Sequence, residues 1–310
     1  MTHPSTSGER RIAELGVLLV VVCWAANFVI IKAAIADVPA LVFTGIRYVL
    51  ASASLLLLLR VRTGSLLIPR RDLAVALLLG ALGFGVYQVL WISGLRTITA
   101  GESALLVATS PVIVALVAAA IGVESLSIGR SIGVAISFTG VALVIGAGGE
   151  LALGASLVGD LLTLGGTVAW ATYTAFTAKA MRRIDAVPLT AWAVVGGTVV
   201  VVPLAAWEAA TTPAFSLGVP SLAAIAYSGI LAAGLANVVI AHGVRLVGPT
   251  RVTVLQYGVP PLAVVLGALF LGEAILPGHV LGGVVIVLGV ILMRSARGGE
   301  PARRVANPDR

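Results

Sequence analysis

Arg47 is the only basic residue deep within a long apolar run of the sequence, the run over residues 40–59. An arginine in the middle of a membrane costs at least about 2.5–3.5 kcal/mol, so we expect Arg47 to face a protein interior or to reach the surface. Glu102, which begins a later apolar run, is the expected ion-pair partner. The pair could contact a substrate carboxylate or gate a pathway, or Arg47 could be a structural anchor.

Polar and aromatic side chains recur inside the other apolar runs. Asn27 lies one helical turn after Trp24, and its amide must find partners or a wet cavity within a membrane. Aromatic rings mixed with amides suit an amphipathic organic solute, although helix packing is the alternative reading. The predicted cavity residues are Trp24, Asn27, Arg47, Tyr87, Gln88, Trp91, Ser110, Pro111, Trp170, Tyr173, Tyr227, Asn237, Gln256, Tyr257 and Pro260.

Two prolines and six glycines occupy matching positions in the two halves of the chain. Pro111 and Pro260 fall near the middles of apolar runs, where each removes a backbone hydrogen bond, and paired breaks of this kind indicate a transporter site. Glycines four or seven residues apart let helix backbones approach closely, either within the chain or at a homodimer face. These glycines are Gly129, Gly133, Gly140, Gly278, Gly282 and Gly289.

Proton-carrying groups are few. Asp160, Glu102 and His242 could carry protons, but all three map near the ends of predicted helices, where we expect water to solvate them. The single cysteine, Cys23, excludes an internal disulfide, and no Cys/His group has the spacing of metal ligands. Because no catalytic motif is present either, we expect neither an enzyme nor a cofactor.

The elements that must position these residues follow from composition. Of 310 residues, 59% are hydrophobic and 11% charged, with a mean hydropathy of +1.10. Soluble proteins are about 45–50% apolar and about 25% charged, so a soluble enzyme is excluded. The sequence predicts an all-α membrane protein of ten helices, at about 13–33, 40–59, 73–95, 99–121, 131–147, 157–178, 188–207, 219–241, 249–272 and 278–294.

Basic residues give the expected orientation. With the N-terminus inside, seventeen of the 20 Lys and Arg residues fall in inside segments, and only Lys32 and Arg96 fall outside. This bias predicts a multi-pass protein of a bacterial inner membrane with both termini in the cytoplasm. The basic residues that give the net charge of +7 therefore set the orientation of the helices in the membrane, and nucleic acid is not an expected partner. The expected partners are the lipid bilayer, a small-molecule substrate and, through the glycines, a second copy of the chain.

The two halves of the sequence repeat each other. A shift of 149 residues aligns Pro111 with Pro260 and Glu124 with Glu273, and a shift of 146 aligns Trp24 with Trp170. Five helices in each half make the repeats inverted, a plan common in secondary transporters. We therefore expect one repeat over 13–147, a second over 157–294 and a cytoplasmic tail over 295–310.

The chain resembles the drug/metabolite transporter superfamily, with two EamA-type repeats. The resemblance rests on Trp24 to Phe28, Phe43 to Arg47, Gly101 to Pro111, Gly122 to Glu124, Trp170, Pro260–Pro261, Leu271 to Glu273 and Gly282 to Gly289. It implies a secondary transporter of a small organic metabolite or drug that works by alternating access, with export of amino acids or amphipathic compounds as the first choice. Uptake or exchange of a sugar-like or nucleotide-like metabolite is the alternative, and a membrane receptor or scaffold is the alternative outside transport. The second repeat departs from the first at Ala193, which replaces Arg47.

Overall fold

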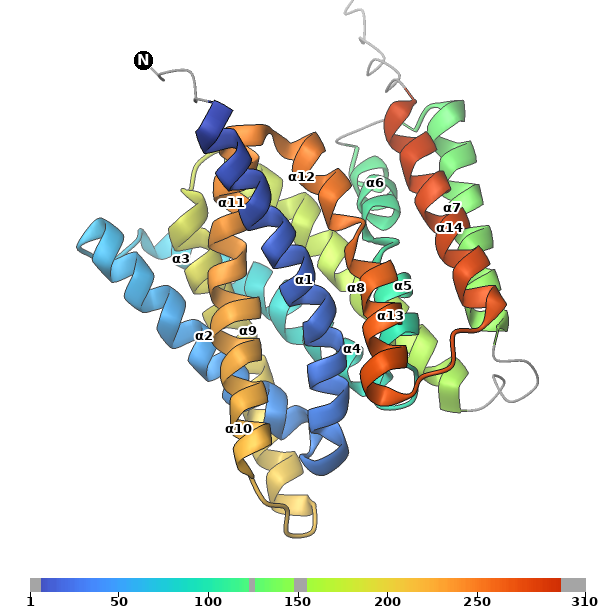
Figure 1. The fold of residues 1–310 in the computed structure, drawn as a ribbon. Helices are drawn as coiled ribbons and strands as arrows, with labels where there is room; N and C mark the ends of the chain where they lie inside the picture. Colours follow the sequence, from blue (N-terminus) through green and yellow to red (C-terminus); the bar gives the residue numbers. More distant parts are fainter. Residues whose placement is uncertain (1–6, 123–125, 148–154, 297–310) are drawn as a thin grey trace, which may run out of the picture.

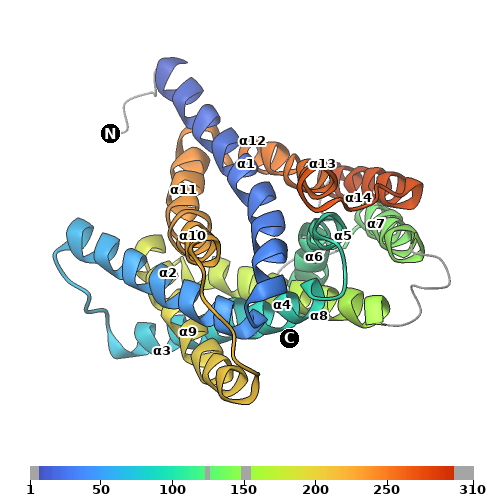
Figure 2. The same cartoon turned by 60° about the horizontal axis from the view of Figure 1, so that its bottom comes forward.

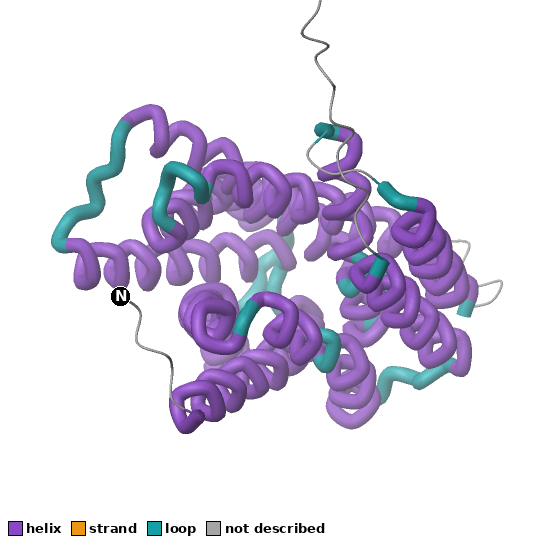
Figure 3. The backbone as a smooth tube through the Cα atoms, turned by 90° about the horizontal axis from the view of Figure 1, so that it is seen from above, coloured by secondary structure: helices purple, strands orange, loops and turns teal. Residues whose placement is uncertain are grey.

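Long helices joined by short loops make up the structure, a computed structural model that describes residues 7–122, 126–147 and 155–296 (Figure 3). The first half contains α1 (Ser7–Asp37), α2 (Ala40–Thr63), α3 (Arg70–Gly80), the π-helical segment η1 (Ala81–Val86), α4 (Tyr87–Leu95), α5 (Ala100–Val107), α6 (Ser110–Ala120) and α7 (Ile128–Gly146). The second half contains α8 (Ala155–Ala180), α9 (Ala186–Thr211), α10 (Val219–Ala226), the π-helical segment η3 (Tyr227–Leu235), α11 (Ala236–Val247), α12 (Pro249–Gln256), α13 (Val259–Leu271) and α14 (Pro277–Ser295).

The expected ten-helix membrane architecture is confirmed. Within the described ranges, nine helical stretches are long and apolar enough to span a membrane, and α8 is the tenth long helix. Helix α1 begins and helix α14 ends at the same end of the bundle (Figure 1), here called the terminal end; the opposite end is called the far end. Several helices run past their predicted limits. Helix α1 continues through Arg10 and Arg11, because charged residues at a membrane surface can stay in a helix whose backbone bonds are internal.

Capping residues explain where neighbouring helices separate. Thr99 accepts a hydrogen bond on its hydroxyl from the Glu102 backbone N–H at 3.0 Å, which starts α5 at Ala100, with only four residues between it and the end of α4 at Leu95. Gly64 (φ 71°) ends α2, and Gly272 (φ 66°) ends α13, both in the left-handed conformation that glycine adopts without strain. The short gap that the sequence leaves between the predicted helices 73–95 and 99–121 is therefore a turn, around Arg96.

Irregular helix segments occur at repeat-related positions. The span α5–α6 is interrupted just before Pro111, and the span α12–α13 is interrupted just before Pro260. The π-helical segments η1 and η3 begin at Ala81 and Tyr227, which the 146-residue shift relates. A π-turn leaves backbone carbonyls free of their usual α-helical partners and is frequent at functional sites. All four irregular segments therefore mark corresponding places in the two repeats.

The predicted glycines hold α7 and α14 together at one edge of the bundle (Figures 1 and 2). A Cβ atom on Gly133 would lie 2.7 Å from the Gly289 carbonyl oxygen, and one on Gly140 would lie 2.7 Å from that of Gly282. Gly129 meets the Ala296 side chain in the same way, and Gly278 meets Ala147 and the Leu143 carbonyl. The glycines therefore serve packing within the chain, and they give no support to a dimer face.

Candidate substrate cavity

A cavity of about 370 Å³ lies between the two halves of the bundle. Its walls come from α1, α2, η1, α4, α5, α6 and, in the second half, α8, η3, α11, α12 and α13. The breaks before Pro111 and Pro260 and both π-helical segments contribute to it, so each irregular segment borders the same space. Its volume falls in the range of pockets that enclose small organic ligands.

Thirteen of the fifteen predicted residues line this cavity. They are Trp24, Asn27, Arg47, Tyr87, Gln88, Trp91, Ser110, Pro111, Trp170, Asn237, Gln256, Tyr257 and Pro260. Tyr173 instead lies behind the wall, with its ring centroid 5.1 Å from that of Phe84 and 5.2 Å from that of Trp170. Tyr227 donates from its hydroxyl to the Cys23 carbonyl at 2.9 Å and ties η3 to α1.

Sequence reasoning missed three large aromatic residues of the lining, Phe28, Tyr48 and Phe84. Tyr48 donates its hydroxyl hydrogen to the Gln88 side-chain oxygen at 3.1 Å and so orients that amide. Its position next to Arg47 in the same apolar run was an available signal. Phe28 and Phe84 carry no polar group, and apolar patterning cannot separate a cavity wall from ordinary packing.

Arg47 is buried, with 4% of its surface exposed, at the side of the cavity formed by α2 and η3. Its Nη1 atom donates to the Ser228 hydroxyl at 2.5 Å, and its guanidinium carbon lies 5.2 Å from the ring centroid of Tyr48 and 5.9 Å from that of Trp91. Aromatic faces at such distances stabilise a cation without neutralising it. The site therefore keeps a positive charge beside the cavity.

The expected ion pair between Arg47 and Glu102 is not formed. Glu102 lies at the start of α5, where it faces two acidic residues, Asp160 and Glu273, and one basic residue, Lys32. Arg47 points instead toward η3, because Ser228 and the two aromatic rings are its neighbours. Similar depth in the membrane was the basis of the prediction, and depth alone does not give the direction of a side chain around its helix.

Several polar atoms of the cavity wall have no hydrogen-bond partner in the structure. They are the Asn27 Oδ1, Arg47 Nε, Gln88 Nε2 and Tyr257 hydroxyl. Buried polar groups in proteins are nearly always satisfied, and each exception needs an explanation. Three of these atoms therefore belong to residues that line one cavity: Arg47 Nε and Gln88 Nε2 are donors, and Asn27 Oδ1 is an acceptor.

Aromatic rings form one continuous wall of the cavity. Tyr87 stacks on Trp91 with centroids 6.2 Å apart, and it also lies 5.4 Å from Trp170. The polar edges of two indoles are already used, because Trp24 donates to the Ala232 carbonyl of η3 at 3.0 Å and Trp91 donates to the Ser103 hydroxyl at 3.0 Å. These bonds fix the rings and leave their faces for stacking.

The cavity continues toward the terminal end. A second hollow of about 480 Å³ shares Ser110, Pro111, Trp170, Thr253 and Gln256 with the cavity. It extends to Arg130 at the start of α7 and Arg294 near the end of α14. The cavity and this hollow therefore adjoin, and together they extend from the centre of the bundle toward the end where the described chain begins and ends.

Packed side chains close the far end. A cluster of buried apolar residues from α1, α2, α4 and α10 includes Ile31, Phe43, Trp91, Leu95 and Ile225. Lys32 lies beside this cluster and donates to the carbonyl oxygens of Leu95 at 2.7 Å and Arg96 at 3.2 Å, the last carbonyls of α4. A cation at a helix C-terminus is favourable, so Lys32 ties α1 to α4.

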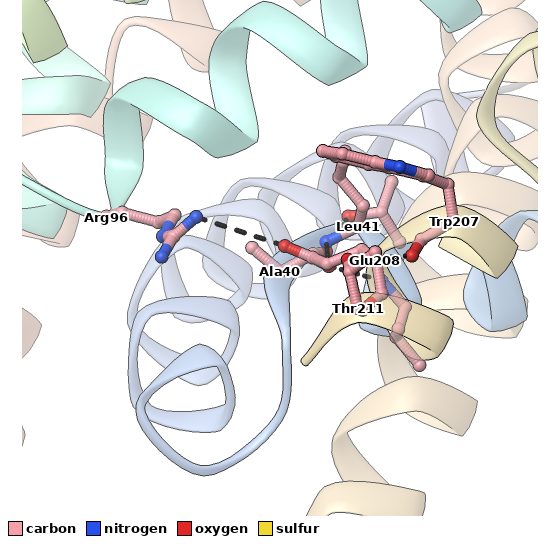
Figure 4. A network of polar contacts seen from close by, with 8 residues as sticks. Ala40, Leu41, Arg96, Trp207, Glu208 and Thr211 are labelled. Carbon is pink, nitrogen blue, oxygen red and sulfur yellow. Dashed lines mark hydrogen bonds and ion pairs between the residues drawn. The ribbon is translucent and has the colours of Figure 1, made fainter. Parts of the chain in front are cut away.

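Two carboxylates cap helices at the far end. Glu208, near the end of α9, accepts from the backbone N–H groups of Leu41 at 2.7 Å and Val42 at 3.1 Å, and it lies 3.9 Å from Arg96 (Figure 4). Glu273 accepts from the backbone N–H groups of Ala100 at 2.7 Å and Gly101 at 3.3 Å. Carboxylates at helix N-termini are stabilising.

Glu273 corrects an expectation about capping. Glu124 and Glu273 each come shortly before a predicted helix, a position from which the sequence alone predicts that each caps the helix that follows it. Glu273 instead caps α5 in the other half of the chain. Glu124 lies outside the described residues. Sequence proximity favoured the wrong helix, because the N-terminus of α5 lies closer in space than that of α14.

The expectation that water solvates the acidic candidates is wrong. Asp160 is completely buried, with 0% exposed surface, and Glu102 is 8% exposed. Of the three proton-carrying candidates, only His242 lies in an exposed position. Close packing explains the burial: a Cβ atom on Gly159 would lie 2.2 Å from the Thr97 hydroxyl oxygen, so α8 and the end of α4 leave no room for water there.

The sequence matches the EamA-like transporter family over residues 11–146 and again over 157–295. The chain belongs to the EamA-like transporter family. The two matches cover both halves of the bundle that surround the cavity. The resemblance to the drug/metabolite transporters inferred from the motifs is thereby confirmed.

Relatives of the chain agree with this family, and a solved structure shares its fold. The chain is 28% identical to the uncharacterized transporter YdfC of Bacillus subtilis, over 88% of this chain and 87% of the relative. It is 29% identical to a probable terminal-alkyne amino-acid exporter of Streptantibioticus cattleyicolor, over 96% of this chain and 98% of that protein. A crystal structure superposes with a TM-score of 0.62 and 19% identity, covering 91% of this chain and 96% of the other, which shows a common fold.

Proposed function

We propose that this EamA-family transporter exports amino acids or closely related small amphipathic molecules across the inner membrane by alternating access. The terminal end is the cytoplasmic end in this proposal, as the distribution of basic residues favours. The structure is then the inward-open state, since the cavity continues toward the terminal end and packed side chains close the far end.

The observation that carries the proposal is the polar pattern around Arg47. The buried guanidinium has a free Nε atom, and no Asp or Glu of the described residues forms an ion pair with it. Gln88 offers a second unpartnered donor, while Asn27 offers an unpartnered acceptor. A carboxylate at Arg47 and Gln88 with an ammonium group at Asn27 satisfies all three groups, and the aromatic wall accommodates the side chain of such a zwitterion.

A relative supports the same substrate class. The Streptantibioticus cattleyicolor protein, similar to this chain along nearly its whole length, is described as a probable exporter of a terminal-alkyne amino acid. An amino acid with an apolar side chain fits a cavity that has one polar region and one aromatic wall. A sugar or a nucleotide presents polar groups on more sides than this lining serves.

Counterflow in proteoliposomes tests the proposal. Vesicles loaded with unlabelled solute take up the labelled solute without any imposed gradient if the protein transports it. The probes are L-phenylalanine, L-leucine, glucose and uridine monophosphate. We expect counterflow of the two amino acids; counterflow of glucose or the nucleotide alone would overturn the substrate class, and no counterflow of any probe would count against transport of these classes.

Variants of Arg47 separate a role in substrate binding from a structural role. Arg47→Leu should abolish amino-acid counterflow, whereas Arg47→Lys should keep part of it, because a lysine supplies charge without the bidentate geometry. Arg62→Leu, a change in the exposed last turn of the same helix, is the matched control and should transport normally. Full counterflow by Arg47→Leu at matched expression would end the assignment of Arg47 to a substrate carboxylate.

A further inference from the structure

Repeat symmetry relates two contacts at opposite ends of the bundle. The 146-residue shift relates Glu14 on α1 to Asp160 on α8, and the 149-residue shift relates Arg251 on α12 to Glu102 on α5. At the terminal end, Arg251 and Glu14 form an ion pair with Nε and Oε1 2.9 Å apart. At the far end, the corresponding residues Glu102 and Asp160 are both acids.

Asp160 carries the clearest unsatisfied charge in the described bundle. Its side chain is completely buried, and neither of its carboxylate oxygens accepts a hydrogen bond from an N–H or hydroxyl group of the described residues. The titratable group that faces it is the carboxyl of Glu102. An ionised carboxylate in such surroundings is very costly, so the pair requires a positive partner.

The neighbouring charges do not supply that partner fully. Lys32 from α1 is attracted to Glu102 and Glu273, but its ammonium group already donates to two carbonyl oxygens at the end of α4. Glu273, after α13, adds a third carboxylate, and it is engaged with the N-terminus of α5. Arg96 lies outside the cluster, with 61% of its side chain exposed, beside Glu208. At the far end, the single ammonium group of Lys32 therefore faces three carboxyl groups, whereas at the terminal end one guanidinium pairs with one carboxylate.

We propose that the Glu102–Asp160 pair binds a proton, and that this proton is the ion exchanged for substrate. This step rests on the proposed export function. Binding converts one carboxylate to a carboxylic acid that can donate to the other, and no other bond changes. The protonated pair takes the place of the Arg251–Glu14 ion pair of the opposite end.

The proton controls the far end through repulsion. With a proton, the two carboxyl groups can face each other and α5 can pack on α8, as in this structure. Without it, two facing carboxylates repel in a region that excludes water, which favours separation of α5 from α8 and opening of the far end. Helix α5 also carries Ser103, which accepts from Trp91 in the cavity wall, so the same helix responds to substrate and proton. In this proposal the substrate leaves through the far end while the pair is deprotonated, and the binding of a proton then closes that end.

Accessibility of the cavity from the far side tests proton binding without any substrate. The reporter is Ala104→Cys in a Cys23→Ser background, because Ala104 is buried and lines the cavity. A membrane-impermeant maleimide is added outside sealed cells across a range of pH. We expect the labelling rate to rise more steeply with pH in this reporter protein than in Asp160→Asn and Glu102→Gln, in which only the ionisation of the thiol itself remains.

Two further variants sharpen the test. Glu102→Arg copies the ion pair of the terminal end, and it should keep the far end closed, with slow labelling at every pH. Asp37→Asn removes an exposed carboxylate at the end of α1 and should behave as the reporter protein does, so it controls for the removal of a carboxylate elsewhere in the protein. An unchanged pH response in both Asp160→Asn and Glu102→Gln, or a response to sodium at constant pH in place of a response to pH, would overturn the proposal.

Flux measurements separate this proposal from the transport proposal. Wild-type proteoliposomes should accumulate L-phenylalanine against its gradient when a pH gradient is imposed, while Asp160→Asn should keep counterflow and lose this accumulation. Retained accumulation by Asp160→Asn would refute coupling through the pair. If the wild type shows no counterflow, the export proposal fails, and the labelling experiment still decides whether the pair binds a proton.

Discussion

Lys32→Met should open the far end of the protein. The lysine ammonium group donates to the Leu95 carbonyl at 2.7 Å in a half-buried position, and its second bond, to Arg96 at 3.2 Å, is exposed. Hydrogen bonds to charged groups contribute about 1.5–3 kcal/mol, and we count only the half-buried one. Because 1.4 kcal/mol is a tenfold change, methionine should shift the equilibrium toward the outward-open state by about 10- to 100-fold.

The assay is the labelling of Ala104→Cys from outside in a Cys23→Ser background, at one fixed pH. A cysteine at position 104 lines the cavity and is covered at the far end in this structure, so it reacts only when the far end opens. Methionine keeps the aliphatic stem of lysine and therefore most of the packing on α4. Lys179→Met, at the only other lysine of the sequence, changes an exposed position near the end of α8 and is the control.

We expect faster labelling for Lys32→Met and no change for Lys179→Met. Equal rates in Lys32→Met and its parent, with both proteins folded by size-exclusion chromatography, would show that the lysine does not hold the far end closed. The apolar cluster of Ile31, Phe43 and Leu95 would then suffice for closure. A slower rate would also refute the reasoning, since it requires the lysine to favour the open state.

Two further predictions concern packing and topology. Gly140→Ala should lower the thermal stability, by about 1–3 kcal/mol for an overpacked contact, because its Cβ would lie 2.7 Å from the Gly282 carbonyl; Gly146→Ala, on the same helix with open space around it, should be neutral in the same melting experiment. Single cysteines at residues 3 and 305 should resist impermeant maleimide in sealed cells, as seventeen inside basic residues require, and labelling of either would refute cytoplasmic termini.

Much of the fold could be predicted because the membrane imposes it. Apolar length gave the ten spans, and the proline matches located the helix breaks. The glycine matches predicted close packing of two helices but left open whether the contact lies within the chain, as it does between α7 and α14, or between two copies. The depth of polar residues brought thirteen of fifteen candidates to one cavity. Depth is a one-dimensional quantity, however, and it cannot give the direction of a side chain around its helix. Arg47 was therefore assigned to Glu102 when its neighbours are Ser228, Tyr48 and Trp91.

Burial at the far end was the feature that sequence reasoning missed. A position near a helix end suggested water around Asp160, but Gly94 and Gly159 allow α4 and α8 to approach until their backbones touch: a Cβ on Gly94 would lie 2.5 Å from the Gly159 carbonyl. A close approach of two helices depends on residues from both helices. In the sequence, each of these glycines taken alone is indistinguishable from any other small residue. The same limitation hid the cap that Glu273 provides for α5.

The chemistry of this protein lies where its two repeats differ. The symmetric features, which are the paired breaks and the π-helical segments, shape a cavity, and in the proposed mechanism the two ends of the bundle open alternately. At the position related to Arg47, Ala193 packs with its carbonyl against Gly80. Among the described residues that line the cavity, the guanidinium therefore comes from the α2 wall alone. A single cation on one wall suits a solute with one carboxylate end. At the position related to Arg251, Glu102 supplies a carboxyl group in place of a permanently charged guanidinium. In our proposal this carboxyl group needs a proton that can bind and leave. Repeat symmetry thus supplies the movement, and two substitutions that break it supply the selectivity and the dependence on protons that we propose.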